Sequence, residues 1–482
     1  MNLLETFDRL LQPWRGVFSQ ERTFERARRL TFGLLSCLRM HLTSTAICAS
    51  GRQFQDWSAD YRLCSRSPWE THQLFDVVLD HLPGLLPSSQ APVFAALDDT
   101  ILKKTGRRIP GVKILRDPMS PPFRVNLCYG LRFVQLSVLV SPQDQAGPAR
   151  ALPVRFDFAP PANKPRPKAS EEDWEKYREQ KKQRTLGLAG KKAIASMRAS
   201  LDERPETRDR QLIVSGDGSY TIGTVMRDLP KRTTYIGRIR KDAKLHYPLP
   251  ASGSKPVGRP RRYGPKAPTP EQILHDDSVD VVYVKCFAAG QLREIPVKVL
   301  RQVYWRKSGA DMPVQVVIIK ALGYRLRKGS KLLYRKPAFL VCSDLELDLT
   351  TLVQAYINRW EIECNHRDEK SLLGVAQGQV WNPNSVRRLP AFQVAGYSLL
   401  LLASLLSSGF QRTSEYLPLP KWRRKSIRPS LLDLLALLRD QIFATAAATP
   451  ILNFGDFANA ASAAMNSPKQ PLASDTLCTM AA

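Results

Sequence analysis

Apolar residues at helical spacing dominate the first part of the chain. They recur every three or four positions through residues 3–11, 30–42 and 69–82, and this spacing is typical of helices that bury one face. Basic residues gather between them, as in the sequence ERARR at 25–29. The pattern therefore predicts a helical region over residues 1–90.

Two short apolar runs further along the chain lead into acidic residues. The first, PVFAALDD, ends in Asp98 and Asp99, and the second, RQLIVSGD, ends in Asp217 between two glycines. Apolar runs of this length that stop at polar or glycine positions are typical of buried strands. We therefore expect two strands with acids at their ends, where side chains face a crevice rather than the core.

The pattern that follows alternates between helices and strands. A loop rich in Pro and Lys at 160–174 leads into a charged helix over about 171–201, and a short helix is expected at 222–229. The stretch after Asp217 is too long for one connecting helix, so it is interpreted as a β-rich insertion, about residues 229–345. Further strands are predicted at 125–140, 152–158, 234–240, 279–286, 293–300, 314–321 and 337–343.

The carboxyl-terminal part is helical and apolar from residue 387 onward. The apolar run 394–406 is too short to span a bilayer comfortably and predicts a buried helix. Ala, Ser and Asn dominate residues 458–482, which predicts a disordered tail. We expect four regions in all: a helical region at 1–90, an α/β core with its insertion at 91–409, a helical region at 410–457 and the tail.

The charge of the chain favours a polyanionic partner. It carries 72 Lys and Arg against 44 Asp and Glu, which gives a net charge of +28. Such a field attracts polyanions, of which nucleic acid is the commonest. Ribosomal and membrane-surface proteins share this property, so the charge supports a nucleic-acid partner without identifying one.

The cysteines and histidines indicate neither a zinc site nor a disulfide framework. The eight cysteines include no C-x2-C pair, and the six histidines do not cluster with them. The amino terminus is amphipathic, contains acids and lacks a small-residue cleavage site, so no signal peptide is predicted. These features favour a reducing cytoplasm.

A polar stripe lies on the helix that is predicted around residues 356–370. Tyr356, Arg359, Glu363 and Lys370 are three, four and seven residues apart, so at about 100° per residue they project to one side. An acid flanked by two bases suits chemistry on phosphate. The alternative is an exposed helix with an Arg359–Glu363 pair, which is worth only a few tenths of a kcal/mol.

Metal-dependent phosphate chemistry needs more than one acid. Two-metal phosphoryl transfer uses acidic side chains that converge on two divalent ions about 4 Å apart. Glu363 supplies one such acid, and the strand-end residues Asp98 or Asp99 and Asp217 supply the others if the fold brings them together. A single strand-end aspartate is more often a turn or cap residue, so the combination with the helical stripe carries the interpretation.

The spacing Y-x2-R-x3-E-x6-K from Tyr356 to Lys370 resembles the signature of DDE transposases of insertion sequence family 4. That family has its first aspartate in a D-x-T context, which favours Asp98 over Asp99, and its second after a later strand, which fits Asp217. The resemblance implies an α/β fold with an RNase H-like mixed-sheet catalytic core. It also implies that Asp98, Asp217 and Glu363 hold two Mg²⁺ or Mn²⁺ ions. Asp99 stays open as a neighbouring acid, a helix cap or the true ligand.

The resemblance further implies double-stranded DNA as the partner. Arg359 would contact the phosphates of a transposon end through paired hydrogen bonds, Lys370 as a point charge and Tyr356 beside them. For the two bases, neutralisation of nearby acids is the alternative. Residues 1–90 would bind the DNA end, and a homodimer would hold two ends together. We expect a bacterial cytoplasmic location and no membrane partner.

The most basic window, residues 229–266, contains 11 Lys or Arg and one acid. Its GRPRR sequence partly resembles an AT-hook, in which Arg259, Arg261 and Arg262 would enter the minor groove. A loop that contacts phosphates without reading sequence is the alternative. In the family, an aromatic residue of the insertion can hold a flipped base. Trp305 is the candidate here, and a core tryptophan is the alternative.

The implied activity is metal-dependent DNA cleavage at the ends of an insertion sequence, followed by strand transfer to target DNA. An RNase H-like endonuclease that never joins strands would carry the same acids but would not need Lys370. A catalytically inactive, transposase-derived DNA-binding protein is a third alternative, and the complete set of acids argues against it.

Overall fold

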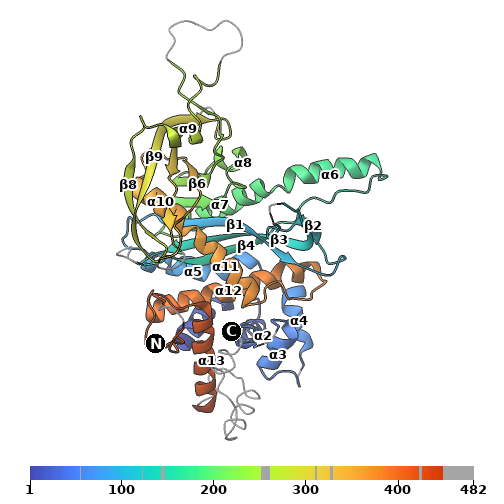
Figure 1. The fold of residues 1–482 in the computed structure, drawn as a ribbon. Helices are drawn as coiled ribbons and strands as arrows, with labels where there is room; N and C mark the ends of the chain where they lie inside the picture. Colours follow the sequence, from blue (N-terminus) through green and yellow to red (C-terminus); the bar gives the residue numbers. More distant parts are fainter. Residues whose placement is uncertain are drawn as a thin grey trace.

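The computed structural model places a mixed sheet in the middle of the molecule (Figure 1). A β-rich unit extends from one side of this sheet, and helices from both ends of the chain pack together on the other side. This arrangement confirms the predicted α/β class, with an RNase H-like core, a β-rich insertion and helical flanks. The structure describes residues 1–38, 40–54, 56–121, 123–142, 147–250, 261–309, 312–325, 329–422 and 426–448.

The central sheet has the strand order β2-β3-β1-β5-β6-β13-β10-β9-β7, with β4 beside β3 and β8 beside β9. Strand β1 is antiparallel to β3 and parallel to β5, and β5 is parallel to β6. The strands of the core are β1 (Val93–Lys103), β2 (Lys113–Arg116), β3 (Leu127–Val140), β4 (Arg150–Phe158), β5 (Leu212–Gly216) and β6 (Thr233–Arg238).

Strand β1 is long because it pairs with β3 along almost its whole length. The antiparallel pairing continues to Lys103, whereas the parallel pairing with β5 stops at Leu97. Asp98 and Asp99 therefore lie in the middle of β1, and the predicted strand end at these acids is wrong. The reason is that β3 supplies hydrogen-bond partners beyond the last residue of β5. Asp217 directly follows the end of β5, as predicted.

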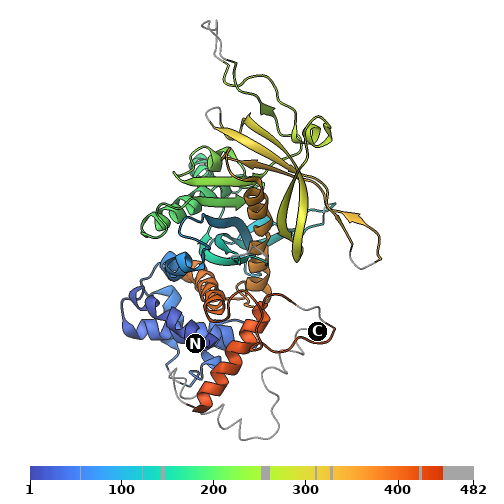
Figure 2. The ribbon, with the colours of Figure 1, turned by 90° about the vertical axis from the view of Figure 1, so that its left-hand side faces the viewer.

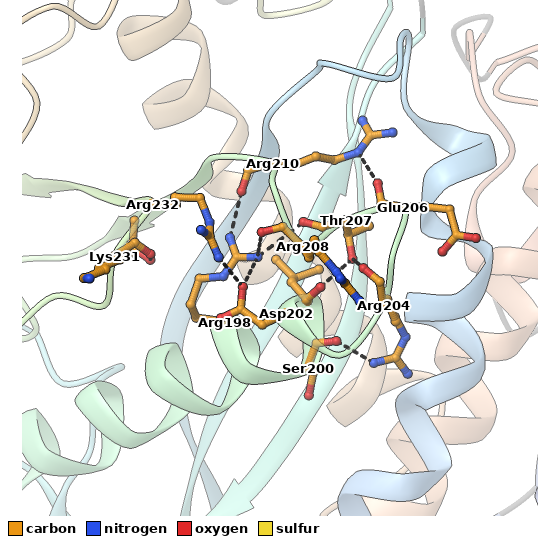
Figure 3. Close-up of polar contacts among 12 residues, drawn as sticks. Arg198, Ser200, Asp202, Arg204, Glu206, Thr207, Arg208, Arg210, Lys231 and Arg232 are labelled. Carbon is orange, nitrogen blue, oxygen red and sulfur yellow. Dashed lines mark hydrogen bonds and ion pairs between the residues drawn. The ribbon is translucent and has the colours of Figure 1, made fainter.

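The connection into β5 is held by a buried arginine at the end of α7 (Leu186–Asp202). Arg198 is 3% exposed and pairs with Asp202, which also pairs with Arg232 (Figure 3). Arg198 and the backbone carbonyls to which it donates form what we call the Arg198 clamp. Because β5 begins directly after the connection that this clamp holds, the clamp helps to set the point at which β5 ends and Asp217 follows. The guanidinium donates hydrogen bonds of 3.3, 3.0 and 2.7 Å to the backbone carbonyls of Thr207, Arg208 and Arg210.

The charged helix predicted over 171–201 is two helices. Helix α6 (Glu171–Gln183) buries no residue and projects from the body of the molecule (Figure 1). Helix α7 starts anew because the Thr185 side chain accepts a hydrogen bond from the backbone N–H of Leu188. A side chain that caps an N-terminus in this way begins a new helix. Thr185 therefore separates α7 from α6.

Every described element before β1 is helical. The helix α12 (Pro383–Ser408) packs against these helices and against β4, and α13 (Leu431–Ala448) packs against α1, α2 and α12. The two ends of the chain thus form one helical unit below the sheet (Figure 1). The amino-terminal helices are α1 (Leu3–Leu11), η1 (Gln12–Gly16), α2 (Glu21–Ser36), α3 (Thr43–Ala49), α4 (Ser58–Ser65), η2 (Thr71–Phe75), α5 (Asp76–His81) and η3 (Leu82–Leu85).

Helix α12 is long and apolar enough to cross a membrane by length and composition, and among the described residues it is the single helix of this kind. Almost all of its apolar stretch is buried inside the protein. The run 394–406 therefore lies in a buried helix, as predicted.

The insertion extends the core sheet rather than forming a separate one. Strand β6 lies within the range predicted for the insertion, yet it pairs in parallel with β5, and β13 then pairs with β6. The short helix α8 (Gly223–Met226) precedes β6. The elements that follow β6 are β7 (Leu245–His246), α9 (Pro270–His275), β8 (Val282–Ala288), β9 (Gln291–Trp305), β10 (Pro313–Ile319), β11 (Gly323–Tyr324), β12 (Leu333–Tyr334) and β13 (Ala338–Cys342).

Two helices join the insertion to the core, α10 (Leu349–Asn358) and α11 (Trp360–Ser371). Helix α10 contacts β5 and β6 of the core and β8 of the insertion, and α11 contacts β1 and β4. Figure 2 shows these helices running between the core strands and the insertion strands. They therefore bring residues that follow the insertion back onto the sheet that carries Asp98.

Candidate active site

Asp98 and Asp217 lie beside each other at the point where β5 ends. The last parallel pair between β1 and β5 joins Leu97 and Gly216, and each aspartate is the next residue along its own strand. Burial raises the pKa of Asp98 to about 7, the charge of Asp217 adds to the rise, and the charge of Arg359 opposes it. Two neighbouring carboxylates, one of which has its pKa raised by the other, form a place where a cation is favoured.

Asp98 and Asp99 point to opposite faces of the sheet, because successive strand residues alternate. Asp98 shares its face with Ala96, which packs against Ile362 of α11. Asp99 accepts a hydrogen bond of 3.3 Å from the hydroxyl of the fully buried Tyr220, and burial raises the pKa of Asp99. The geometry therefore favours Asp98, rather than Asp99, as the acid that works with α11.

Arg359 links Asp98 to Glu363. Its guanidinium lies 3.5 Å from an Asp98 carboxylate oxygen and 2.9 Å from a Glu363 carboxylate oxygen. The arginine side chain is 13% exposed. Burial lowers the pKa of Arg359, but the charges of Asp98 and Glu363 outweigh that effect and raise it overall. Two acids from distant parts of the chain thus contact one arginine.

The helix predicted through residues 356–370 is interrupted at Arg359, which lies between α10 and α11. Arg359 keeps helical dihedral angles, φ −51° and ψ −32°, and its N–H still donates to the carbonyl of Ala355. The helical turn therefore continues through the junction. Tyr356 and Arg359 line one pocket of 660 Å³.

Lys370 lies at the other end of α11, within range of both aspartates of β1. Burial lowers its pKa, Lys103 lowers it further, and the negative charges of Glu369, Asp98 and Asp99 act in the opposite direction. The other three residues of the Tyr356–Lys370 signature thus flank Glu363. Tyr356 and Arg359 lie near the start of α11, and Lys370 lies near its end.

The carboxylates suit divalent cations, since Mg²⁺ and Mn²⁺ prefer oxygen ligands. Among the residues that the structure describes, no three Asp, Glu, His or Cys side chains are already spaced to hold one ion. Arg359 accounts for this spacing, because its guanidinium stands between Asp98 and Glu363 and supplies the positive charge there. The carboxylate oxygens are therefore suitable ligands for such ions. For one ion to bind both Asp98 and Glu363, Arg359 has to move away from at least one of these two carboxylates.

Sequence reasoning missed a buried polar network that supports α11 beneath Asp98. Glu369 is 1% exposed, and neither of its carboxyl oxygens has a hydrogen-bond partner among the described residues. Burial raises the pKa of Glu369 to about 8, and the nearby Gln135 amide opposes the rise only in part. Gln135 lies opposite Asp98 on β3 and donates to Ser137, to which Asn365 of α11 also donates.

The burial of this helix face had a signal in the sequence. Ile362, Asn365 and Glu369 recur at helical spacing on α11, and all three are buried. Glu369 stands in the charged run from Asp368 to Lys370. The sequence pattern gave a phosphate-binding role to Lys370 in this run and no role to Glu369. A neutral acid at this position contacts the strand that carries Gln135 rather than solvent.

A basic pocket of 1050 Å³ opens beside the end of β5. Gly218 and Thr221 line the part of the pocket nearest Asp217, and the other walls come from the insertion. Two of its basic residues are neutralised, because Arg240 pairs with Asp242 and Lys241 pairs with Glu271. The pocket is lined by seven basic residues, Arg238, Arg240, Lys241, Lys244, Arg306, Lys307 and Lys336.

The structure places the remaining predicted residues as follows. Trp305 lines the basic pocket but is 6% exposed, with the Lys307 ammonium 5.4 Å from its ring centroid. Arg261 and Arg262 are exposed. Arg259 lies outside the described residues.

The sheet order, the adjacent aspartates and the glutamate joined to them through Arg359 define an RNase H-like nuclease core, a class that cleaves phosphodiester bonds. Residues 15–310 match the family model described as DDE superfamily endonuclease. This match covers more than half of the chain, so the chain belongs to that family.

The family membership has consequences for substrate and cofactor. DDE superfamily endonucleases act on DNA and generally use divalent metal ions. The matched residues include Asp98 and Asp217 and end before Glu363. No curated protein matches the chain.

Proposed function

We propose that the protein is a DDE transposase of the insertion sequence family 4 branch. It would cleave DNA at the ends of an insertion sequence and join the new ends to target DNA. The observation that carries this proposal is that Asp98 lies beside Asp217 at the end of β5 and is joined to Glu363 through Arg359. The spacing from Tyr356 to Lys370 supports the choice of branch.

Asp98, Asp217 and Glu363 would hold two Mg²⁺ or Mn²⁺ ions. Such ions activate the attacking water or 3′-hydroxyl and stabilise the leaving oxygen. Arg359, once it leaves the carboxylates, can donate two parallel hydrogen bonds to a phosphate, and Lys370 adds a point charge at the other end of α11. Tyr356 lines the pocket next to Arg359 and can orient the same phosphate.

The two pockets beside the acids give the DNA a basic path. Lys336 lines both the pocket next to Asp217 and the pocket next to Arg359, so basic side chains continue from one to the other. Arg238, Lys244 and Arg306 line the larger pocket, and their side chains form no hydrogen bond or ion pair with the described residues. Basic groups without protein partners are available for phosphate oxygens.

Transposition requires that two DNA ends be held at once, so we propose a homodimer as the working form in the bacterial cytoplasm. The amino-terminal helical unit, residues 1–90, would bind the DNA end. The helical carboxyl-terminal region packs against that unit through α13, which would let it serve the same assembly.

The test of the site uses three variants, Asp98→Ala, Asp217→Ala and Glu363→Ala. Each should reduce Mg²⁺-dependent cleavage of duplex DNA to background, because a lost ligand removes the metal geometry. DNA binding, measured by fluorescence anisotropy, should stay nearly intact because the basic surface is unchanged. Glu175→Ala, on the exposed helix α6, is the matched control. Full cleavage by any of the three variants would refute the role of that residue.

Asp99→Ala separates the two neighbouring acids of β1. Since Asp99 faces Tyr220 on the opposite face, this variant should keep Mg²⁺-dependent cleavage. Loss of cleavage in Asp99→Ala together with its retention in Asp98→Ala would exchange their roles.

Hydrolysis without joining is the alternative function, because the matched family is described as an endonuclease. A labelled target duplex separates the two functions, since a transposase yields a joined product and a plain endonuclease yields nicks alone. Lys370→Ala should weaken cleavage less than loss of a carboxylate, because the lysine acts on the phosphate. Imperfect inverted repeats in the DNA flanking the gene would support the transposase.

A further inference from the structure

The hairpin that joins β2 to β3 carries large apolar side chains that the active site does not use. We call residues 113–129 the β2–β3 arm. Apolar side chains that are this exposed and this close together mark an interaction surface. The exposed fractions are 58% for Ile114, 83% for Met119, 90% for Phe123, 59% for Val125 and 65% for Leu127.

The β2–β3 arm continues the sheet face that carries Asp98. Strand β3 pairs with β1 and with β2 without a break in register over this stretch, and Gln135 lies opposite Asp98. Alternate residues of a strand share one face, so Leu127 lies on the face of Gln135. Ile114 pairs with Tyr129 and shares that face as well.

Helix α11 connects the acids to the base of the arm. The pKa of Asp117 is lowered first by its hydrogen bond from Lys103 and also by the charge of Lys370. The Lys103 ammonium lies 2.6 Å from the Asp117 carboxylate. Glu363 at the start of α11 faces the acids, and Lys370 near its end faces the arm. A DNA strand that leaves the acids along α11 therefore meets the arm.

Hydrogen bonds fix the shape of the arm's tip. Asp117 accepts a hydrogen bond of 3.1 Å from the N–H of Met119, and its own N–H donates to the carbonyl of Asn126. The Ser120 hydroxyl both accepts from and donates to the backbone of Asn126. These bonds hold the backbone at Met119, Ser120 and Asn126, so little ordering entropy is lost there on binding.

The charge of the arm and its base selects DNA over a second copy of the chain. Residues 103–130 contain seven Lys or Arg and one acid, Asp117, and Lys103 already neutralises that acid. The arm of a second copy carries the same excess of basic residues, so two arms would repel each other. Architectural DNA-binding proteins combine basic groups for the phosphates with apolar wedges for the base steps, and the arm has both.

We propose that the β2–β3 arm contacts the DNA duplex next to the cleaved phosphodiester, with Phe123 and Met119 against the base faces and Arg116 and Arg124 against the flanking phosphates. This proposal rests on the proposed function, because it requires a DNA substrate in the cleft. It assigns a base-stacking role to an element outside the helix and strands that hold the acids.

The experiment uses the double variant Met119→Ala, Phe123→Ala and duplex DNA with 2-aminopurine placed at successive positions near the cleaved bond. Base stacking on an apolar or aromatic side chain is worth enough that the double variant should bind roughly 5- to 150-fold more weakly. The 2-aminopurine brightening seen with the wild type should disappear. Tyr283→Ala, which removes an exposed aromatic on β8, is the control and should bind like the wild type.

A charge variant separates base contact from phosphate contact. The apolar variant should keep the wild-type dependence of affinity on salt, whereas Arg116→Ala, Arg124→Ala should lower the slope by about one per arginine. All five side chains tested are exposed, so folding is expected to be unchanged, and thermal unfolding checks this.

Two outcomes would overturn the proposal while leaving the proposed function intact. One is wild-type binding and wild-type 2-aminopurine signal in the apolar variant, alongside normal Mg²⁺-dependent cleavage. The other is that, without DNA, the apolar variant sediments as a monomer where the wild type sediments as a dimer. That result would assign the arm to contact between protein subunits. If the wild type itself neither binds nor cleaves DNA, the proposed function fails instead.

Discussion

The Arg198 clamp and the basic pocket beside Asp217 are both rich in basic residues, yet their charges are used differently. Arg198 is 3% exposed and donates to three backbone carbonyls that belong to one connection. In the pocket, the side chains of Arg238, Lys244 and Lys336 form no hydrogen bond or ion pair with the described residues. The Nη1 and Nη2 donors of Arg198 are used within the protein, whereas these three pocket residues leave their donors for a ligand.

The difference shows how a net charge of +28 has to be divided before it indicates a partner. A buried guanidinium must find acceptors, because an unpaired charge inside a protein is costly. Its charge is then part of the fold. Only the basic residues that lack protein acceptors are available for phosphate. Four variants test this distinction between buried groups that belong to the fold and basic groups that are available to DNA. They are given from the largest expected effect to the smallest.

Arg198→Ala should destabilise the protein by about 3 kcal/mol or more, because three backbone carbonyls, two of them in buried hydrogen bonds, would lose their donor. Urea unfolding measures the loss. The comparison predicts that the folded fraction still binds DNA with the wild-type salt dependence. Arg238→Ala is the matched control and should change stability by less than about 0.5 kcal/mol. Equal unfolding midpoints for both variants would show that the clamp does not hold β5.

Glu369→Gln tests a buried acid whose carboxyl oxygens, unlike the Arg198 guanidinium, have no hydrogen-bond partner in the part of the chain that the structure describes. The folded pKa of about 8 lies above the usual value of 4.5, so the folded protein keeps a proton that the unfolded chain releases. Stability therefore falls as the pH rises from about 4.5 to about 8. At about 1.4 kcal/mol per pKa unit, the glutamine variant should exceed the wild type by a few kcal/mol at alkaline pH.

Melting temperatures at acidic and alkaline pH measure this effect. Well below pH 4.5 the two proteins should be about equally stable, because Glu369 is then protonated in both the folded and the unfolded state. Glu175→Gln, on the exposed helix α6, is the control and should follow the wild type. Parallel curves for Glu369→Gln and the wild type would contradict the neutral, buried state of this acid.

Replacing Arg238, Lys244 and Lys336 together by alanine should change DNA binding and leave stability alone. Each phosphate contact contributes about 0.9 to the salt slope, so three contacts remove about 2.7. Wild-type affinity should then fall roughly 40-fold more than that of the variant between 50 and 200 mM salt. Anisotropy titrations across salt concentrations give the slope. An unchanged slope would show that the pocket does not contact the backbone of DNA.

Arg261→Ala, Arg262→Ala should have the smallest effect. Two exposed arginines on a loop should lower the slope by up to about 1.8 and weaken binding to all sequences about equally. This is the result expected of a loop that contacts phosphates. Loss restricted to A·T-rich duplexes would instead support the AT-hook interpretation.

The sequence located the strands and acids because each has a local signal. Apolar runs placed β1 and β5 in the chain, and the turn after Gly216 placed Asp217 at the end of its strand. The extension of β1 beyond Asp98 had no such signal, because it depends on pairing with β3. Alternation put Asp98 and Asp99 on two faces, but which face α11 covers is decided by packing.

The features that depend on contacts between distant segments were out of reach of the sequence. The Arg198 clamp joins α7 to carbonyls that any residue could supply. The basic pocket is lined by residues from Gly218 to Phe339, and no local pattern joins them. The tie of Arg359 to Asp98 forms only when the helix rests on the sheet.

The return of α11 to β1 after the whole insertion also decides when the protein can act during its synthesis. A nascent chain that has left the ribosome as far as β13 carries Asp98 and Asp217 but neither Arg359 nor Glu363. It has the two aspartates of the proposed site but not Glu363, the third acid of that proposal. The ability to cut is therefore expected to appear late in translation, once most of the chain has been made and the helices after the insertion have folded.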